Sequence, residues 1–301
     1  MTQPAAGLMR RIALDEALLP QALALSGEAG WNQTAADWRI FQRHGEIFGV
    51  RIGERLVATA AILPYGADIA WISMVLVTAE FRRRGLATCL MRQCMARLHA
   101  ERRVALLDAT EAGEPVYRAL GFVTLTRMTR WGRGGRRTDT TPPPLEGGGW
   151  GEGSVQPGTA AVRTPPPVPL PQGEGESLQE LDSSAFGAHR EFLLDDFLTR
   201  PGAAAWTYSE NAVVLRPGRH AWQIGPVIGT PPHATRLLHQ AIDAAPGPVV
   251  IDLLEAGADL ASELAKRGFI ARRGFCRMAL GRDTLPGTPA RLLAAAGPEF
   301  G

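Results

Sequence analysis

The chain contains few residues that could form disulfides or metal sites. It has three cysteines among 301 residues, and Lys266 is its single lysine, so arginine carries nearly all of the positive charge. Cys89 and Cys94 fall on one expected helix without the spacing of metal ligands, and Cys276 is far away in the sequence. We therefore expect three buried thiols in a reducing compartment, with no disulfide and no metal site.

Long apolar runs and a strong charge imbalance are also missing. No run of 18 or more apolar residues could cross a bilayer, and the first residues do not form a charged segment followed by an apolar one. The formal net charge of +2 gives no general attraction to nucleic acid or to anionic membranes. These features predict a cytoplasmic protein without a membrane or nucleic-acid partner. A length of 301 residues is enough for two modest domains.

The clearest local pattern is an apolar strand that leads through a basic turn into an amphipathic helix. Residues 71–77 form an uncharged run of strand length, and apolar residues recur every four positions from 86 to 98. The turn between them, residues 82–87, contains three arginines followed by Gly85, and Ala87 lies just beyond. The first amides of a helix have no partners within the helix, and the helix dipole favours an anion there. The pattern therefore predicts a site for a pyrophosphate.

This turn resembles the acetyl-CoA-binding motif of the GCN5-related N-acetyltransferases (GNAT), written Arg/Gln-x-x-Gly-x-Gly/Ala. Arg82, Gly85 and Ala87 occupy its defining positions, whereas Ala79 stands where many members have proline. A basic surface turn before an ordinary core helix is the alternative interpretation of so short a pattern.

Further matches extend the resemblance over residues 10–131. The segment 116–122, Val-Tyr-Arg-Ala-Leu-Gly-Phe, resembles the second motif of the family, commonly Tyr-x-x-x-Gly-Phe. Gly30-Trp31-Asn32 and the segment 107–110 resemble a bacterial subgroup that carries a second, acetyltransferase-like C-terminal domain. The resemblance implies an α/β fold with a mixed sheet in each of two tandem GNAT-like domains.

The periodicity of the chain is compatible with this fold. Thr34 is a plausible N-cap for a helix over 35–44, and we expect a second helix to begin at Thr110 and to run to Arg118 or Ala119, with Gly121 as its C-cap. The run 103–108 should pair parallel to the central strand, because strands that alternate with helices favour that arrangement. The other expected strands of the first domain cover residues 10–14, 47–52, 56–63, 70–77 and 122–131.

Composition divides the chain into a domain at 1–131, a linker at 132–176, a second domain at 177–285 and a tail at 286–301. The linker is rich in proline and glycine and poor in apolar residues, so we expect it to be disordered. Its polyproline pieces could bind an SH3-like domain, and the arginines of 133–137 could contact RNA, but a plain spacer is the favoured interpretation. Residues 289–301 are expected to pack as a short helix. The oligomeric state, monomer or homodimer, is left open.

The second domain repeats a short sequence pattern of the first. Leu120-Gly121-Phe122 followed by Arg127-Met128 is matched by Arg267-Gly268-Phe269 followed by Arg277-Met278, which suggests a duplicated fold. The second copy has Ile-Gly-Thr-Pro-Pro-His at 228–233 in place of the phosphate turn. We therefore expect it to repeat the fold without binding the coenzyme and to form a wall of the acceptor pocket.

The resemblance implies the roles of several residues. It makes Tyr117 the acid that protonates the departing thiolate; a core tyrosine is the alternative, and the matching position of the second copy is Leu264. It also implies that the central strand splays from its parallel neighbour and leaves backbone groups free for the pantetheine arm and the oxyanion. Thr110 stands where relatives often have a coenzyme-contacting asparagine, and a role as a helix cap is equally compatible. The residues expected to bind the coenzyme are Val75, Val77, Arg82, Arg83, Arg84, Gly85, Leu86, Ala87 and Thr110.

The general base is less well defined. Asp108 and Glu111 lie nearest the expected cleft and could act through water, and Asp37 and Glu28 are alternatives. For each of the four, the competing interpretation is a solvated surface carboxylate without a catalytic role. In that case water itself would accept the proton of the amine. No cysteine stands beside a predicted base, so we expect a ternary complex rather than an acyl-enzyme.

The predicted function is acetyl transfer from acetyl-CoA to a primary amine of a small molecule or amino acid. A non-catalytic acyl-CoA sensor is the rival interpretation, and RNA binding is a more remote one. The acceptor cannot be read from the sequence. Four tryptophans could line its pocket or fill the cores: Trp31, Trp38, Trp206 and Trp222.

Overall fold

The computed structural model describes residues 9–134 and 176–301. The polyproline and glycine runs of the predicted linker lie outside these residues, as does most of the arginine cluster at 133–137. Gly132 and Arg133, predicted as linker, belong instead to the last strand of the first half. None of the described helices is long and apolar enough to span a membrane.

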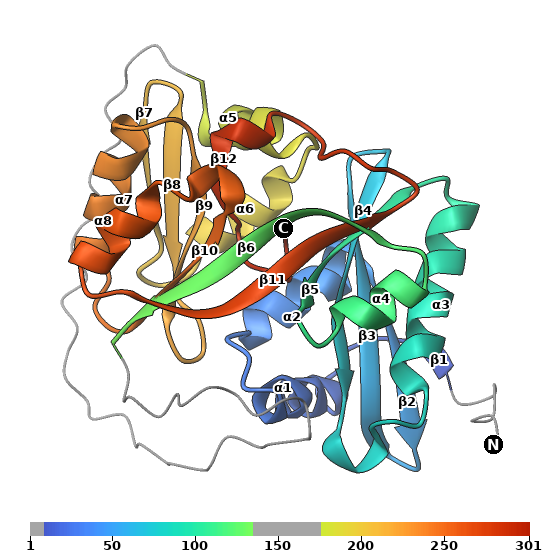
Figure 1. Ribbon diagram of the computed structural model, residues 1–301. Helices are drawn as coiled ribbons and strands as arrows, with labels where there is room; N and C mark the ends of the chain where they lie inside the picture. Colours follow the sequence, from blue (N-terminus) through green and yellow to red (C-terminus); the bar gives the residue numbers. More distant parts are fainter. Residues whose placement is uncertain (1–8, 135–175) are drawn as a thin grey trace.

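Each half alternates strands and helices (Figure 1). The first half consists of β1 Met9–Ile12, α1 Leu18–Glu28, α2 Ala35–His44, β2 Glu46–Ile52, β3 Arg55–Tyr65, β4 Ile69–Val77, η1 Ala79–Phe81, α3 Leu86–Ala100, β5 Val104–Thr110, α4 Glu114–Ala119 and β6 Val123–Arg133. The second half consists of α5 Leu178–Phe186, α6 Glu191–Leu198, β7 Ala204–Tyr208, β8 Asn211–Arg216, β9 Trp222–Ile228, α7 His233–Ala244, β10 Val249–Leu254, η2 Glu255–Gly257, α8 Leu260–Lys266, β11 Ile270–Leu280, η3 Pro289–Arg291 and β12 Leu292–Ala294.

Local chemistry explains several element boundaries. The predicted N-cap of α2 is confirmed: the Thr34 side chain accepts from the Asp37 N–H, and the Asp37 carboxylate accepts from the Thr34 N–H at 2.6 Å, which together form a capping box. The predicted helix start at Thr110 is wrong, because β5 continues through that residue and α4 begins at Glu114. Thr110 Oγ1 instead accepts from the Gly113 N–H at 3.2 Å and closes the turn between strand and helix.

All described strands join one mixed sheet in the order β1-β2-β3-β4-β5-β11-β6-β10-β12-β9-β8-β7. Strand β11 of the second half lies between β5 and β6 of the first, and β6 pairs on its other side with β10 of the second. In Figure 1 the long β6–β11 pair crosses the middle of the molecule. The two halves therefore exchange strands and share one sheet rather than forming two separate sheets.

Helices cover both faces of this sheet. Helices α1, α2, α5 and α6 bury a core common to both halves, whereas α3 covers a second core on the opposite face of the first half, and α7 and α8 cover a third. The strands contribute side chains alternately to the two faces: Ile69 and Trp71 face the shared core, and Ala70 and Ile72 face α3.

The expectation of a short helix over 289–301 is wrong. Only the single turn η3 forms before the chain enters the sheet as β12, because its backbone pairs with the unpaired edges of β9 and β10. The following residues enter the shared core, where Phe300 stacks on Phe41 with ring centroids 5.5 Å apart and its carbonyl accepts from the Tyr65 hydroxyl at 2.9 Å. Tertiary pairing overrides the helix propensity of the alanine-rich sequence.

Candidate active site

Strands β4 and β5 part after a short paired segment. They pair in parallel only between residues 69–71 and residues 104–106, so the rest of each strand has no partner across this gap. Met74 has a φ of +51°, and the register between β3 and β4 shifts beside it, which marks a β-bulge. The bulge is held by Thr59 Oγ1, which donates to the Met74 carbonyl at 2.8 Å. The expected splay of the central strand is therefore present.

The splay leaves backbone groups of β4 without a partner on a neighbouring strand. The Thr78 N–H donates to the Val57 carbonyl while Val77 lies in register with Ala58, so the N–H and C=O of Val77 point away from β3 and toward the gap. Val75 precedes it by two residues, and the side chains of both pack against the core beneath α3. These are the two backbone positions that the resemblance assigns to the pantetheine arm.

The turn after β4 presents a row of free amides. None of the backbone N–H groups of residues 83–88 donates to another described group, and the first helical bond is made by the Cys89 N–H to the Gly85 carbonyl at 3.0 Å. Gly85 is the N-cap of α3 with a φ of +78°, and a Cβ built on it would meet nothing within 4 Å. The residues present therefore fit a diphosphate, because the amides converge on open space at a helix N-terminus.

The arginines of the turn help to hold its shape. Arg82 Nε donates to the Val77 carbonyl at 3.1 Å, and the Arg84 guanidinium lies 4.7 Å from the Phe81 ring centroid while donating to the Glu80 carbonyl at 3.1 Å. Glu28 at the end of α1 accepts from the Thr78 hydroxyl at 2.7 Å and from the Ala79 N–H. Glu28 therefore anchors the turn, which argues against its role as a general base.

Tyr117 on α4 packs against the same core as Val75 and Val77. Its ring fits over Gly113, where a Cβ would come within 3.1 Å of Cε2. Burial, with a smaller contribution from the nearby Cys94, raises the pKa of Tyr117 to about 12, so the phenol keeps its proton at neutral pH. Its hydroxyl has no hydrogen-bond partner among the described residues and is not one of the fully enclosed polar atoms. The phenol is therefore free to donate to a ligand.

Sequence reasoning missed Ser73. Its Oγ atom is enclosed and has no hydrogen-bond partner among the described residues, and the residue adjoins the bulge of β4, beside the gap. Enclosed polar groups without a partner are costly and are concentrated at functional sites. Its signal in the sequence was a lone hydroxyl within the apolar run 69–77.

Asp108 is committed to a buried ion pair. Its two carboxylate oxygens accept from Nε and Nη2 of Arg277 on β11, both at 2.9 Å, and the Asp108 side chain has no exposed surface. Burial raises the pKa of Asp108 despite the opposing effect of Arg277. This geometry argues for a link between the two halves and against a base that acts through water.

A second pair repeats this link. Arg130 on β6 donates twice to Asp252 on β10, at 2.8 Å each, so each half supplies one arginine and one aspartate. The repeat inferred from Arg127-Met128 and Arg277-Met278 is therefore out of register, because the contacts equate Arg130 with Arg277. Counting from the glycine of each Gly-Phe pair, Gly121 and Gly268, would have aligned Arg130 with Arg277 from the sequence alone.

Two further carboxylates differ in availability. Asp37 is fully buried and accepts from Arg200 at 2.7 Å and from Arg216 at 3.3 Å. Burial alone would raise its pKa, but the two arginines outweigh burial and hold the pKa of Asp37 below its usual value. Glu111 is exposed, has no hydrogen bond or ion pair among the described residues, and lies against Gly274 of β11. Of the four carboxylates considered, Glu111 alone has no hydrogen-bond or ion-pair partner among the described residues.

The corresponding gap of the second half is filled. Strands β9 and β10 pair in parallel only over residues 222–224 and 249–251, and β12 then inserts between them. The turn at 228–233 also lacks a row of consecutive free amides: Gly229 N–H donates to the Arg291 carbonyl, Thr230 N–H donates to Asn211 Oδ1, and two prolines, which have no N–H, follow. Leu264 replaces the tyrosine and is buried. In the second half, β12 thus occupies the gap that corresponds to the open gap between β4 and β5 in the first half.

The tryptophans and thiols serve mainly as packing groups. Trp38 is fully buried, and Trp31 packs at the edge of the shared core. Trp206 and Trp222 pack against the core beneath α7 and α8. Cys94 and Cys276 are buried thiols as expected, but Cys89 is half-buried.

A cavity of about 240 Å³ lies between the halves, at the closed end of the β4–β5 gap. Trp71 and Leu106, the last paired residues of the two strands, line it together with Arg277, Phe186 and Glu255. It does not include the turn at 82–87. No group of three or more His, Cys, Asp or Glu residues in 9–134 and 176–301 could hold a metal ion.

Two family models match the chain. The model described as Acetyltransferase (GNAT) family matches residues 13–122, and that described as Acetyltransferase (GNAT) domain matches residues 178–294. No curated protein matches it.

Solved structures share the two-part architecture. A Pyrococcus horikoshii structure described as a candidate acetyltransferase has a TM-score of 0.72 at 18% identity, covering 100% of this chain and 99% of its own. A GCN5-related N-acetyltransferase from Sphaerobacter thermophilus has a TM-score of 0.58 at 16% identity, covering 95% and 98%. A tandem GNAT protein from the clavulanic acid biosynthesis pathway, solved without AcCoA, has a TM-score of 0.55 at 16% identity, covering 90% and 97%. At these identities the likeness concerns the fold. With a GNAT model matching each half, the chain belongs to the GCN5-related N-acetyltransferase superfamily and contains two domains of that family.

Proposed function

We propose that the first half transfers an acetyl group from acetyl-CoA to a primary amine of a small molecule or amino acid within a ternary complex. The observation that carries the proposal is the combination of free amides at 83–88 with the unpaired gap between β4 and β5. The amides would hold the diphosphate, and the edge of β4 at Val75 and Val77 would hold the pantetheine arm. The filled gap of the second half supports one coenzyme site per chain.

Transfer requires one bond to form and one to break. The neutral amine nitrogen attacks the thioester carbonyl carbon, the C–N bond forms, and the C–S bond breaks with the electron pair leaving on sulfur. A backbone N–H of β4 stabilises the negative charge that develops on the carbonyl oxygen. Tyr117 donates its proton to the departing thiolate and regains one from solvent, while the amine loses its extra proton to water or to Glu111. The products are the amide and free coenzyme A.

The assignment of the proton acceptor follows from elimination. Asp108, Asp37 and Glu28 are each held by arginine or backbone donors, whereas Glu111 is not. The Glu111 carboxylate lies against β11, the neighbour of β5 on the side away from β4. We therefore propose that any role of Glu111 is mediated by water, and that Asp108 positions β5 through Arg277.

The test is release of free coenzyme A thiol from acetyl-CoA in the presence of a panel of primary amines and amino acids. Tyr117→Phe should lower kcat by about 10²- to 10⁴-fold, the usual contribution of a positioned acid, and leave the Kd of acetyl-CoA unchanged. Tyr208→Phe is the matched control, since Tyr208 is 45% exposed on the second half.

Three outcomes would count against the proposal. Acetyl-CoA binding without turnover on any acceptor would favour a non-catalytic binding protein. Turnover unchanged in Tyr117→Phe would remove the acid assignment. Absence of acetyl-CoA binding would end the proposal as a whole.

A further inference from the structure

Arg273 on β11 is a recessed arginine without a carboxylate partner. It has no hydrogen bond and no ion pair among the described residues, and its guanidinium lies 4.9 Å from the centroid of the Phe275 ring. Arg273 is half-buried, whereas the buried arginines each have a carboxylate within 3 Å; they are Arg130, Arg190, Arg200, Arg216 and Arg277. The exception is notable because a half-buried cation without a carboxylate partner has lost part of its hydration without compensation.

The surroundings of Arg273 make its charge unfavourable. Arg130 stands directly opposite it in the β6–β11 register, and the Arg130 guanidinium lies 5.5 Å from the same Phe275 ring. Burial, followed by the repulsion of Arg130, lowers the pKa of Arg273 to about 10. Like charges opposite each other in a sheet destabilise the pair. A site with this arrangement is electrostatically suited to an anion.

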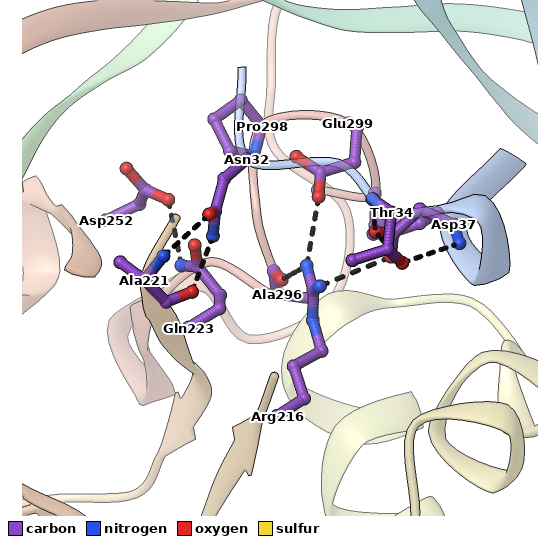
Figure 2. A network of polar contacts seen from close by, with 12 residues as sticks. Asn32, Thr34, Asp37, Arg216, Ala221, Gln223, Asp252, Ala296, Pro298 and Glu299 are labelled. Carbon is purple, nitrogen blue, oxygen red and sulfur yellow. Dashed lines mark hydrogen bonds and ion pairs between the residues drawn. The ribbon is translucent and has the colours of Figure 1, made fainter. Parts of the chain in front are cut away.

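The nearby carboxylates do not fill this role. Asp252 and Glu299 both act on Arg273 at longer range. Asp252 is held by both bonds from Arg130, and Glu299 accepts from Arg216 at 2.9 Å. Figure 2 shows these two carboxylates on either side of Asn32: Asp252 accepts from Gln223, and Glu299 accepts from Arg216.

The position of Arg273 relates it to the proposed reaction. Phe275 pairs with Thr110, the last residue of β5, so Arg273 lies just beyond the end of that strand. Because β4 and β5 are parallel, this is the edge of the sheet at which the gap opens. Only β5 separates β11 from β4, and paired strands are about 4.8 Å apart, so two such spacings, roughly 10 Å, are the lower limit of the distance at the end where β4 and β5 part. An amine and a carboxylate on one small molecule can span that distance, given the length of the arginine side chain.

We propose that Arg273 binds a carboxylate of the acyl acceptor, so that the acceptor is an amino acid or another amine that carries a carboxylate. This inference rests on the proposed acetyl transfer and narrows its substrate class. The planar guanidinium offers two parallel N–H donors to a carboxylate, and the same anion compensates the repulsion from Arg130. Arg273 is thus a specificity-determining residue: its charge is electrostatically unfavourable in the free protein, and the carboxylate of the bound substrate compensates that charge.

The test compares amino acids with their decarboxylated amines, such as phenylalanine with phenethylamine and lysine with cadaverine. Wild-type protein should favour the carboxylated member of the pair it uses. Arg273→Gln should raise the KM for that member by about 10- to 100-fold, the range for a hydrogen bond to a charged group, without changing the KM for the decarboxylated amine or the Kd of acetyl-CoA. Arg273→Lys should recover part of the loss, and Arg92→Gln, at an exposed position of α3, should behave as wild type.

Stability gives a readout that does not depend on turnover. Arg273→Gln should unfold at the same or a higher temperature than wild type, because it removes a repulsive charge. The preferred amino acid should raise the Tm of wild type but not that of Arg273→Gln. A lower Tm in Arg273→Gln, with equal effects on both members of a pair, would make the residue structural and overturn the inference. So would a wild-type preference for decarboxylated amines. A Tm response to amino acids without turnover would refute the proposed transfer while sustaining the carboxylate site.

Discussion

Replacing Asp108 by asparagine should destabilise the protein strongly. The substitution removes the negative charge that faces Arg277, whose guanidinium is enclosed between the carboxylate and the Trp71 ring, 4.7 Å from the ring centroid. Removing one partner of a buried ion pair typically costs about 3–5 kcal/mol, because the other charge stays buried without compensation. For a chain of this size each kcal/mol lowers Tm by about 2–4 °C, so the shift should be roughly 6–20 °C.

Urea denaturation followed by tryptophan fluorescence measures the free energy of unfolding directly. Glu111→Gln is the matched control, because that carboxylate is exposed and has no partner among the described residues; its effect should lie within about 0.5 kcal/mol. The double substitution Asp108→Leu with Arg277→Met should recover most of the lost stability, since an apolar pair of similar volume often replaces a buried ion pair without cost.

The reasoning would be refuted if Asp108→Asn unfolds like wild type. Wild-type stability combined with lost acetyl transfer would make Asp108 a proton acceptor rather than a link between the halves. Failure of the double substitution to recover stability would show that the pair contributes through more than mutual charge compensation.

Two further predictions concern a carboxylate on α4 and the three cysteines. The hydrogen bond from the Cys276 thiol and those from Arg118 lower the pKa of Glu114 from 4.5 to about 2. A carboxyl group whose pKa is lower in the folded than in the unfolded protein stabilises the fold at pH values above its unfolded pKa, so this contribution should disappear as pH falls from 4.5 to 2. Glu114→Gln should therefore flatten this part of the curve of unfolding free energy against pH. A curve that is unchanged in Glu114→Gln would contradict the prediction. Burial raises the pKa of Cys94 to about 12 and that of Cys276 to about 11, so iodoacetamide at pH 8 should label the half-buried Cys89 first. Fast labelling that persists in Cys89→Ser would contradict this order.

Local sequence signals predicted much of the first half. Thr34 was recognised as an N-cap because a threonine side chain can accept from a free amide of a helix start, and the structure adds Asp37 as the second member of a capping box. The strand, basic turn and helix over 71–98 were recognised because apolar periodicity changes from strand to helix across a glycine. These features depend on residues close to one another in the chain.

Features that depend on distant residues could not be predicted. The insertion of β11 between β5 and β6, and of β12 between β9 and β10, leaves no mark on local periodicity. Thr110 was misplaced at a helix start because its hydroxyl closes a turn that resembles a cap at the level of sequence. Strand edges elsewhere in the fold decided where the alanine-rich segment after Arg291 would lie.

In the candidate site, too, features that depend on residues close in the sequence were predicted, and features that depend on distant residues were not. The amides of 83–88 follow from a short motif, whereas the partner of Asp108 is contributed by a strand 169 positions away. Arg273 was indistinguishable from surface arginines until its surroundings were known, and Ser73 became notable through its missing partner.

The most direct test of the account is calorimetric titration of acetyl-CoA into wild type, Gly85→Glu and Gly268→Glu. The two glycines are matched, with φ of +78° and +80° and nothing within 4 Å of a built Cβ, but Gly268 follows α8 of the second half. We expect one acetyl-CoA per chain in wild type and in Gly268→Glu, and no measurable binding in a folded Gly85→Glu, whose carboxylate would repel the diphosphate. Two molecules per chain, or unchanged affinity in Gly85→Glu, would contradict the claim that the amides at the start of α3 form the coenzyme site.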